Sequence, residues 1–278
     1  MLFGIPVGEL ALLAGAILIA GIVSGVMSGL FGIGGSTVII PVVYEIFRLL
    51  EVPDDVRMQL SIGTALAVTV PTTLRAFFTH RAKGAVLIEP LRIWAIPAAL
   101  GVALGSYIAY IAPAVVFKTA FILFAIFMSL RFLLGRDDWR LGDRLPGTPV
   151  MAAAGFSFGA LATLVGIAGG SFSTLFLTLY GTAFHTAVAT STGLGVIIGV
   201  PASIGYMIAG WPHMAVLPPF SIGFVSILGV LLIAPASVLA APYGARLAHR
   251  LSKRKLEIGF GLFLMFVAVR FAASLVLE

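Results

Sequence analysis

Residues 21–37, GIVSGVMSGLFGIGGST, are echoed by residues 155–171, GFSFGALATLVGIAGGS, so the chain repeats a glycine-rich pattern. The two copies start 134 residues apart, and both lie inside long apolar runs. Irregular backbone is tolerated within a membrane only where it is buried in protein or lines a cavity. Glycine breaks at matching places in two halves are therefore typical of the binding site of a transporter.

The composition identifies an integral membrane protein. Of 278 residues, 60% are hydrophobic and 10% are charged, and the mean hydropathy is +1.13. Apolar runs of about 20 residues, long enough to cross a bilayer, occur at 8–33, 58–79, 93–112, 114–134, 150–167, 187–209, 216–242 and 256–277. They leave no room for a soluble catalytic domain. We expect one membrane transport domain over 1–278, with repeat 1 at about 8–134 and repeat 2 at about 147–277.

Basic residues indicate the orientation. Eleven of the 17 Lys and Arg residues lie in three connectors: Arg81, Lys83, Arg131, Arg136, Arg140, Arg144, Arg246, Arg250, Lys253, Arg254 and Lys255. Cytoplasmic connectors are enriched in Lys and Arg, so these three are assigned to the cytoplasm and the uncharged connectors 111–117 and 210–217 to the outside. Because the positive charge flanks membrane spans, it does not indicate nucleic-acid binding.

This assignment makes the two halves inverted. The connector after the second element is internal in repeat 1 (80–85) and external in repeat 2 (210–217). Each repeat then crosses the membrane an odd number of times, so its first segment must enter and return, with short return limbs at 36–50 and 171–183. The predicted fold is an all-α polytopic membrane protein with two inverted-topology repeats, each a Gly-broken helical hairpin followed by three transmembrane helices.

The glycine breaks are the first candidate site. Each short limb begins after a Gly-Gly pair, and the candidate residues are Gly34, Gly35, Ser36, Thr37, Gly169, Gly170 and Ser171. A helix start offers unpaired N–H groups and the positive end of the helix dipole, so two such starts can bind an anion. The alternative is that each serine caps its helix. For the glycines spaced by four, beginning at Gly21 and Gly155, we favour helix packing.

A second duplicated pattern adds hydroxyl groups. Residues 61–71 and 190–201 both carry Ser and Thr residues and end in proline, which favours Thr64, Ser191 and Thr192 as substrate donors. Alternatively, these hydroxyls bond back to their own helices. Arg75 is the most isolated charge within a span, and it either attracts an anion or extends to the interface.

The remaining charged residues carry less information. Lys118 lies near a span end and is expected to be an interfacial anchor. No Asp or Glu is predicted at the midplane, so a buried carboxylate proton relay has little support and the coupling ion stays open. The four histidines are dispersed, which predicts no metal site, and no cofactor is expected.

With HRAKG at 80–84 and APYGARLAHR at 241–250 added to the duplicated breaks, the chain resembles the sulfite exporter TauE/SafE family over nearly its full length. The resemblance implies a permease in the plasma (inner) membrane of a prokaryote for small, often sulfur-containing anions such as sulfite, sulfonates or sulfoacetate. The second break is one residue longer before its serine than the first, so the two half-sites need not be equivalent.

We therefore expect a secondary transporter that works by alternating access, not an enzyme. A passive anion channel is one alternative, and an intramembrane serine hydrolase using Ser36 or Ser171 is another, although neither serine stands in a G-x-S-x-G motif. The expected partners are a small anionic substrate and the lipid bilayer, without nucleic acid. The sequence leaves open a homodimer, the identity of the anion and the direction of transport.

The orientation is testable because the chain has no cysteine. We predict that His80→Cys and Ser252→Cys are shielded from an impermeant thiol reagent added outside, whereas Ala114→Cys and His213→Cys react. External labelling of His80→Cys with protection of His213→Cys would reverse the orientation. Labelling of only one of His80→Cys and Ser252→Cys would remove the inverted repeat.

Overall fold

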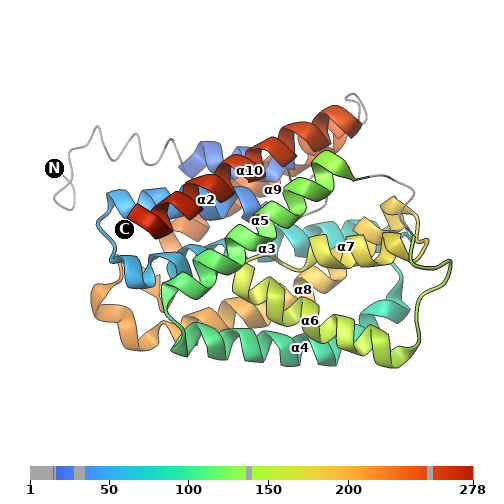
Figure 1. Cartoon of the computed structure of the whole chain (residues 1–278), viewed down its shortest axis with the longest axis horizontal. Helices are drawn as coiled ribbons and strands as arrows, with labels where there is room; N and C mark the ends of the chain where they lie inside the picture. The colour runs from blue at the N-terminus through green and yellow to red at the C-terminus, as the bar shows by residue number, and fades with distance from the viewer. Residues whose placement is uncertain (1–14, 16, 28–34, 136–139, 249–252, 278) are drawn as a thin grey trace.

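Apolar helices make up nearly all of the chain that the computed structural model describes, namely residues 15, 17–27, 35–135, 140–248 and 253–277 (Figure 1). The elements are a helix at Ile17–Met27, α2 (Ser36–Leu49), α3 (Asp54–Ala82), α4 (Ile88–Ile111), α5 (Ala114–Leu134), α6 (Thr148–Val165), α7 (Gly170–Leu179), α8 (Phe184–Ala209), the 3-10 helix η1 (Trp211–Val216), β1 (Ser221–Ile222), β2 (Val225–Ser226), α9 (Ile227–Ala248) and α10 (Lys253–Leu277). Among them, seven helices have the length and hydropathy needed to cross a bilayer.

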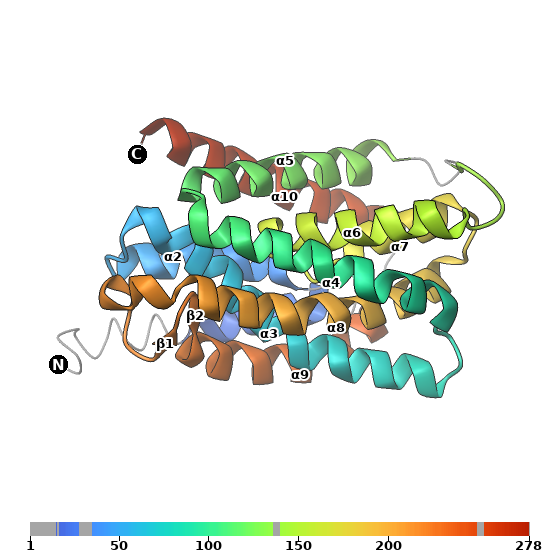
Figure 2. The same ribbon diagram turned by 90° about the horizontal axis from the view of Figure 1, so that it is seen from below.

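The two halves contain the same order of elements. In each, a helix is followed by a short helix and then by three longer ones, with α2 and α7 as the short members at 14 and 10 residues. Figures 1 and 2 show the connectors α3/α4 and α7/α8 at one end of the molecule, together with the ends of α5 and α9 and the starts of α6 and α10. The connectors α2/α3, α4/α5 and α8/α9 lie at the other end. The helix ends that flank the three basic connectors are thus all at the first end.

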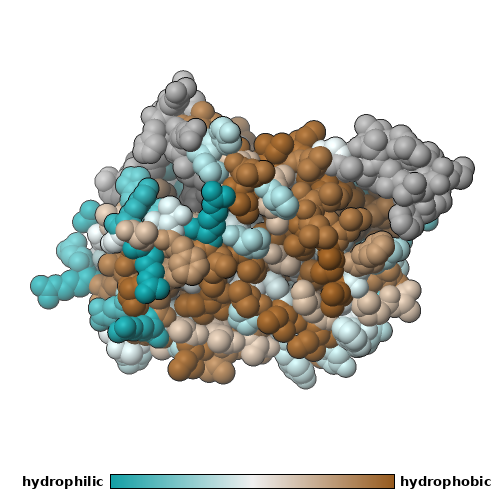
Figure 3. All heavy atoms as spheres, turned by 180° about the vertical axis from the view of Figure 1, so that it is seen from behind, coloured by the Kyte–Doolittle hydropathy of each residue, from teal (hydrophilic) through white to brown (hydrophobic). Residues whose placement is uncertain are grey.

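The outer surface is suited to lipid. Large apolar side chains such as Ile96 on α4 and Phe266 on α10 are 73% and 70% exposed. In Figure 3 such residues form a broad hydrophobic band, and hydrophilic residues gather at the end that carries the basic connectors. An apolar belt with a charged end is expected of a multi-pass membrane protein, which this chain is.

Glycines allow the two halves to interlock. Gly25, in the first helix, faces Ser237 of α9 so closely that a Cβ would overlap the carbonyl oxygen of Ser237. In the same way, a Cβ on Gly159 of α6 would overlap the carbonyl oxygen of Ala98 on α4. Each half thus packs its first helix on a helix of the other half, and the packing interpretation of the spaced glycines is confirmed at these positions.

One expected span was placed wrongly. The sequence predicted a helix over 216–242, but α9 begins only at Ile227, after η1 and a two-stranded antiparallel pair in which Ser221 faces Ser226. Pro218 and Pro219 follow η1 and cannot supply helical N–H groups. Phe220 and Gly223 then take φ values of 60° and 53°, which reverse the chain. The structure is therefore not entirely α-helical.

Lys118 is not the interfacial anchor that the sequence indicated. Its side chain is 2% exposed, and Nζ lies 2.8 Å from both carboxylate oxygens of Asp54 at the start of α3. The Tyr44 hydroxyl of α2 donates to the same carboxylate at 2.9 Å, and Arg57 Nη1 lies 3.3 Å from it. A buried ammonium is stable only when paired, and here the partner comes from another helix.

The interlocking predicts opposite effects for two glycine substitutions in helices. Gly159→Ala should lower the thermal stability, since overpacking costs about 1–3 kcal/mol. The matched control is Gly259→Ala, because a Cβ at Gly259 meets nothing within 4 Å. It should be neutral or stabilising by up to about 1 kcal/mol, given the helix propensity of alanine. Equal melting temperatures of the two variants in detergent would contradict the proposed packing.

Candidate functional site

The second glycine break is formed by two residues in a left-handed conformation. Gly166, which ends α6, has φ +81°, and Gly169, which precedes α7, has φ +72°. Glycine adopts such angles without steric cost. The hydrogen bond from Ser173 N to Gly169 O is 3.1 Å long, and the N–H groups before Ser173 in α7 lie outside the helical ladder. The break predicted at 166–170 is confirmed.

The first short limb starts in the predicted place. Gly35 is the residue before α2, and its carbonyl accepts bonds from Val38 N at 3.0 Å and Ile39 N at 3.1 Å. Gly35 packs so closely on Ser24 of the first helix that a Cβ would overlap the Ser24 hydroxyl. Thr37, in the first turn of α2, is buried. Gly34 and the rest of 28–34 lie outside the described residues.

Both candidate serines are buried with unused hydroxyls. Ser36 and Ser171 are 0% and 3% exposed. In the part of the chain that the structure describes, neither Oγ has a hydrogen-bond partner, and no side-chain bond caps either helix. The interpretation as helix caps is therefore wrong for this conformation. A buried hydroxyl without a partner costs free energy, so its presence at both helix starts calls for an explanation.

The structure places the second break beside α2, the short limb of the first half. A Cβ on Gly166 would lie 2.7 Å from Ile40 Cδ1, one turn beyond Ser36 in α2, and 3.0 Å from Ile62 of α3. On the other side, a Cβ on Gly169 would lie 2.5 Å from Ile198 Cδ1 of α8. The second break is thus packed between α2 and α3 of the first half and α8 of its own half.

The other three candidate hydroxyls already have backbone partners. Thr64 Oγ1 accepts a 3.0 Å bond from Ser226 N, just before α9. Ser191 donates to Val188 O at 2.7 Å, and Thr192 donates to Ala189 O at 2.6 Å. In this conformation the two α8 hydroxyls bond back to their own helix, as the alternative interpretation expected.

Arg75 stands apart from the buried serines. Its side chain is exposed on the half of α3 that leads to the basic connector. The structure therefore does not bring Arg75 together with Ser36 and Ser171.

Two polar residues with structural roles were missed by the sequence analysis. Tyr206 on α8 is fully buried, and its hydroxyl donates to Thr163 O at 2.9 Å, near the end of α6 where the helix no longer supplies a partner. Thr190 Oγ1 accepts a 3.0 Å bond from Leu87 N before α4, as Thr64 does before α9. A tyrosine within an apolar run gives no signal of such a bond, whereas Thr190 stands in the duplicated hydroxyl pattern.

Comparison with known proteins gives a consistent result. The sequence model of the family described as "Sulfite exporter TauE/SafE" matches residues 17–271. A probable membrane transporter protein of Haemophilus influenzae is 28% identical over 91% of this chain and 95% of its own length. A probable membrane transporter protein of Methanocaldococcus jannaschii is 25% identical over 90% of this chain and 92% of its own length. No solved structure matches.

The bond from Tyr206 to the broken helix yields a prediction. Tyr206→Phe should lower the free energy of unfolding by about 1–3 kcal/mol, because Thr163 O is left buried without a partner. Tyr107→Phe is the control, since Tyr107 is on the exposed surface of α4. Thermal unfolding of both variants in detergent measures the difference. A Tyr206→Phe protein as stable as Tyr107→Phe would show that the bond does not support the break.

Proposed function

Because the chain belongs to the sulfite exporter TauE/SafE family, we propose that this membrane transporter is a secondary carrier for a small sulfur-containing anion. The substrate class is sulfite-like or sulfonate-like, including sulfoacetate. The carrier acts by alternating access in the plasma membrane of a prokaryote.

One observation carries the proposal: the unpartnered hydroxyls of Ser36 and Ser171 at two buried helix starts. An oxyanion offers several acceptor oxygens, and a helix start offers N–H donors and the positive end of a dipole. The hydroxyl adds one more donor to each start. Such a site contains no full positive charge, which suits a carrier that must release its substrate. Arg75, exposed on α3, would attract anions from outside this pair of helix starts.

The arrangement of the helices supports inverted repeats. In Figures 1 and 2, α3 begins at the end opposite the basic connectors, whereas α8 begins at the end that carries them. The α6–α7 hairpin likewise enters and returns at the basic end, and α2 runs back toward the opposite end. Inverted halves can exchange conformations around a central site, and this exchange opens the site alternately to each side.

The two other functions make different predictions. A serine hydrolase needs a general base bonded to its nucleophile, and neither serine has a hydrogen-bond partner among the described residues. A serine-reactive probe that labels Ser36 or Ser171 would favour the enzyme. A passive channel would show no saturable counterflow in proteoliposomes, whereas a carrier exchanges labelled anion against an internal excess.

The hydroxyls themselves provide the central prediction. The double variant Ser36→Ala/Ser171→Ala should lose affinity for sulfite by at least 10-fold, because each lost donor to a charged acceptor is worth about 1–3 kcal/mol. Without anion, the same variant should be as stable as the parent or more stable, since no bond is lost. Anion binding and stability are both measured by thermal shift with and without sulfite.

The control is Ser129→Ala. Ser129 is also a buried serine, but its hydroxyl donates to Gly261 O at 2.7 Å and joins α5 to α10. The Ser129→Ala variant should therefore be less stable than the parent but bind the anion with the same affinity. If the double variant binds sulfite and a panel of sulfonates as the parent does, the helix-start site is wrong.

A further inference from the structure

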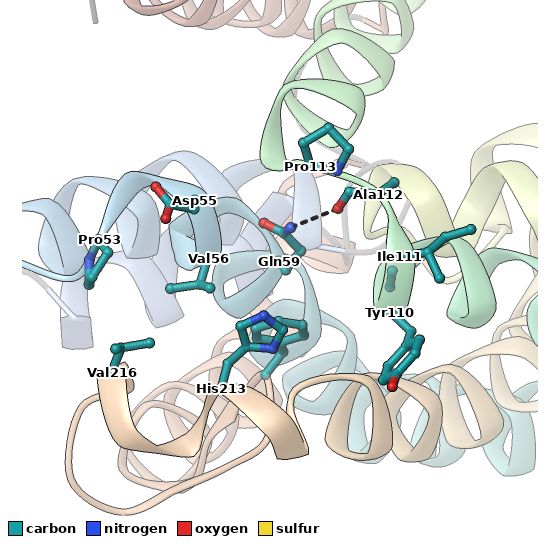
Figure 4. A pocket seen from close by; sticks show the side chains of 12 residues that line it. Pro53, Asp55, Val56, Gln59, Tyr110, Ile111, Ala112, Pro113, His213 and Val216 are labelled. Atoms are coloured by element: carbon teal, nitrogen blue, oxygen red, sulfur yellow. Dashed lines mark hydrogen bonds between the residues drawn. The ribbon is translucent and has the colours of Figure 1, made fainter.

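A cavity opens at the end of the molecule opposite the basic connectors. Its volume is about 480 Å³, and its walls are the start of α3, the end of α4, η1 and Phe224 (Figure 4). This volume is in the range of small-ligand sites. Four side chains with polar atoms line it, namely Asp55, Gln59, Tyr110 and His213. The helix-start site described above does not use any of these residues.

In the described structure, two of these side chains carry acceptor atoms without hydrogen-bond partners. Gln59 is 3% exposed, and its Nε2 donates to Ala112 O at 3.4 Å, which leaves Oε1 without a hydrogen-bond partner in the described structure. Nδ1 of His213 is also buried without a partner. Figure 4 shows both side chains in the wall of the cavity. Neutral imidazole with its proton on Nε2 accepts through Nδ1.

The fully charged side chain among the lining residues is a carboxylate, that of Asp55. Asp55 is an exposed carboxylate at the start of α3 and has no ion pair among the described residues. Lys118 and Arg57 both pair with the carboxylate of Asp54, and neither cation lines the cavity. The end of α4, at Ala109–Ala112, adds the negative end of a helix dipole.

The cavity leads toward the glycine break. Gln59 and Ile62 are three residues apart on α3, about 4.5 Å along the helix axis. Ile62 is the α3 residue that packs against Gly166 in the second break. A ligand held by Gln59 would therefore be about one helical turn from the contact between α3 and the second glycine break.

We propose that this cavity binds a small monovalent cation, which is the coupling ion of the carrier. Carbonyl and carboxylate oxygens are ligands for Na⁺, and the same acceptors bind the N–H groups of ammonium. The binding claim stands on the cavity alone, whereas the coupling role rests on the proposed function. A cation beside a site for an anion reduces the net charge that moves across the membrane.

Thermal shift of the purified protein tests the binding. At constant chloride and ionic strength, NaCl or NH₄Cl in place of choline chloride should raise the melting temperature by roughly 3 °C. Na⁺ and NH₄⁺ in separate arms distinguish a metal cation from an N–H donor. The shift should vanish in Gln59→Leu and in Asp55→Asn. It should persist in Asp143→Asn, which alters an exposed carboxylate near the basic end. Equal melting temperatures of the parent in all salts, or an unchanged shift in Gln59→Leu, would overturn the cation site.

Two combinations separate this proposal from the anion site. A cation shift that survives in Ser36→Ala/Ser171→Ala, together with lost sulfite binding, supports two distinct sites. If the parent shows a cation shift but no response to any anion, the proposed function fails and the cavity still binds a cation. For the coupling role, sulfite counterflow in proteoliposomes should slow at least 10-fold when choline replaces the active cation. Equal rates in both media would reject coupling.

Discussion

The structure depends on the close approach of helices from different halves, which glycine permits. Gly25 meets the backbone of Ser237, and Gly159 meets the backbone of Ala98. Helix association in membranes relies on van der Waals packing, because lipid supplies no hydrophobic driving force between helices. Since each half packs its first helix on the other half, the two halves form one unit. Inside it, the second glycine break packs against the short limb α2.

A second constraint is the supply of hydrogen-bond partners where helices are broken. The Tyr206 hydroxyl donates to Thr163 O at the end of α6, and the Thr64 hydroxyl accepts from Ser226 N just before α9. These bonds make the broken backbone tolerable in an apolar interior. Ser36 and Ser171 are the exceptions at the two helix starts, with hydroxyls that nothing in the described chain satisfies. At the second break, the bond from Tyr206 satisfies the end of α6, whereas the Ser171 hydroxyl in the first turn of α7 has no partner in the described structure.

The two adjacent carboxylates at the start of α3 differ in their ion pairing. Asp54 faces Lys118 and Tyr44 and is neutralised within the protein. Its neighbour Asp55 faces the cavity and has no ion pair in the described residues. Two adjacent carboxylates thus have different surroundings because consecutive residues of a helix point about 100° apart. One strengthens the packing of three helices, and the other contributes charge to an open cavity.

The sequence by itself determined the membrane class, the family resemblance, the second glycine break, the start of the first short limb at Ser36 and, to within one residue, that of the second, predicted at Ser171 and found at Gly170. These follow from composition, from repetition and from the conformational freedom of glycine, all of which are local properties. Tertiary structure decided which polar groups are satisfied. Lys118 was expected at the interface and is buried, because Asp54 of another helix lies 2.8 Å away. Ser191 and Thr192 bond within their own helix, Tyr206 supports the break, and residues 221–226 form a small β pair. Some of these outcomes depend on a partner that is distant in the chain. Others depend on which neighbouring carbonyl a hydroxyl bonds to. Sequence spacing alone cannot specify either.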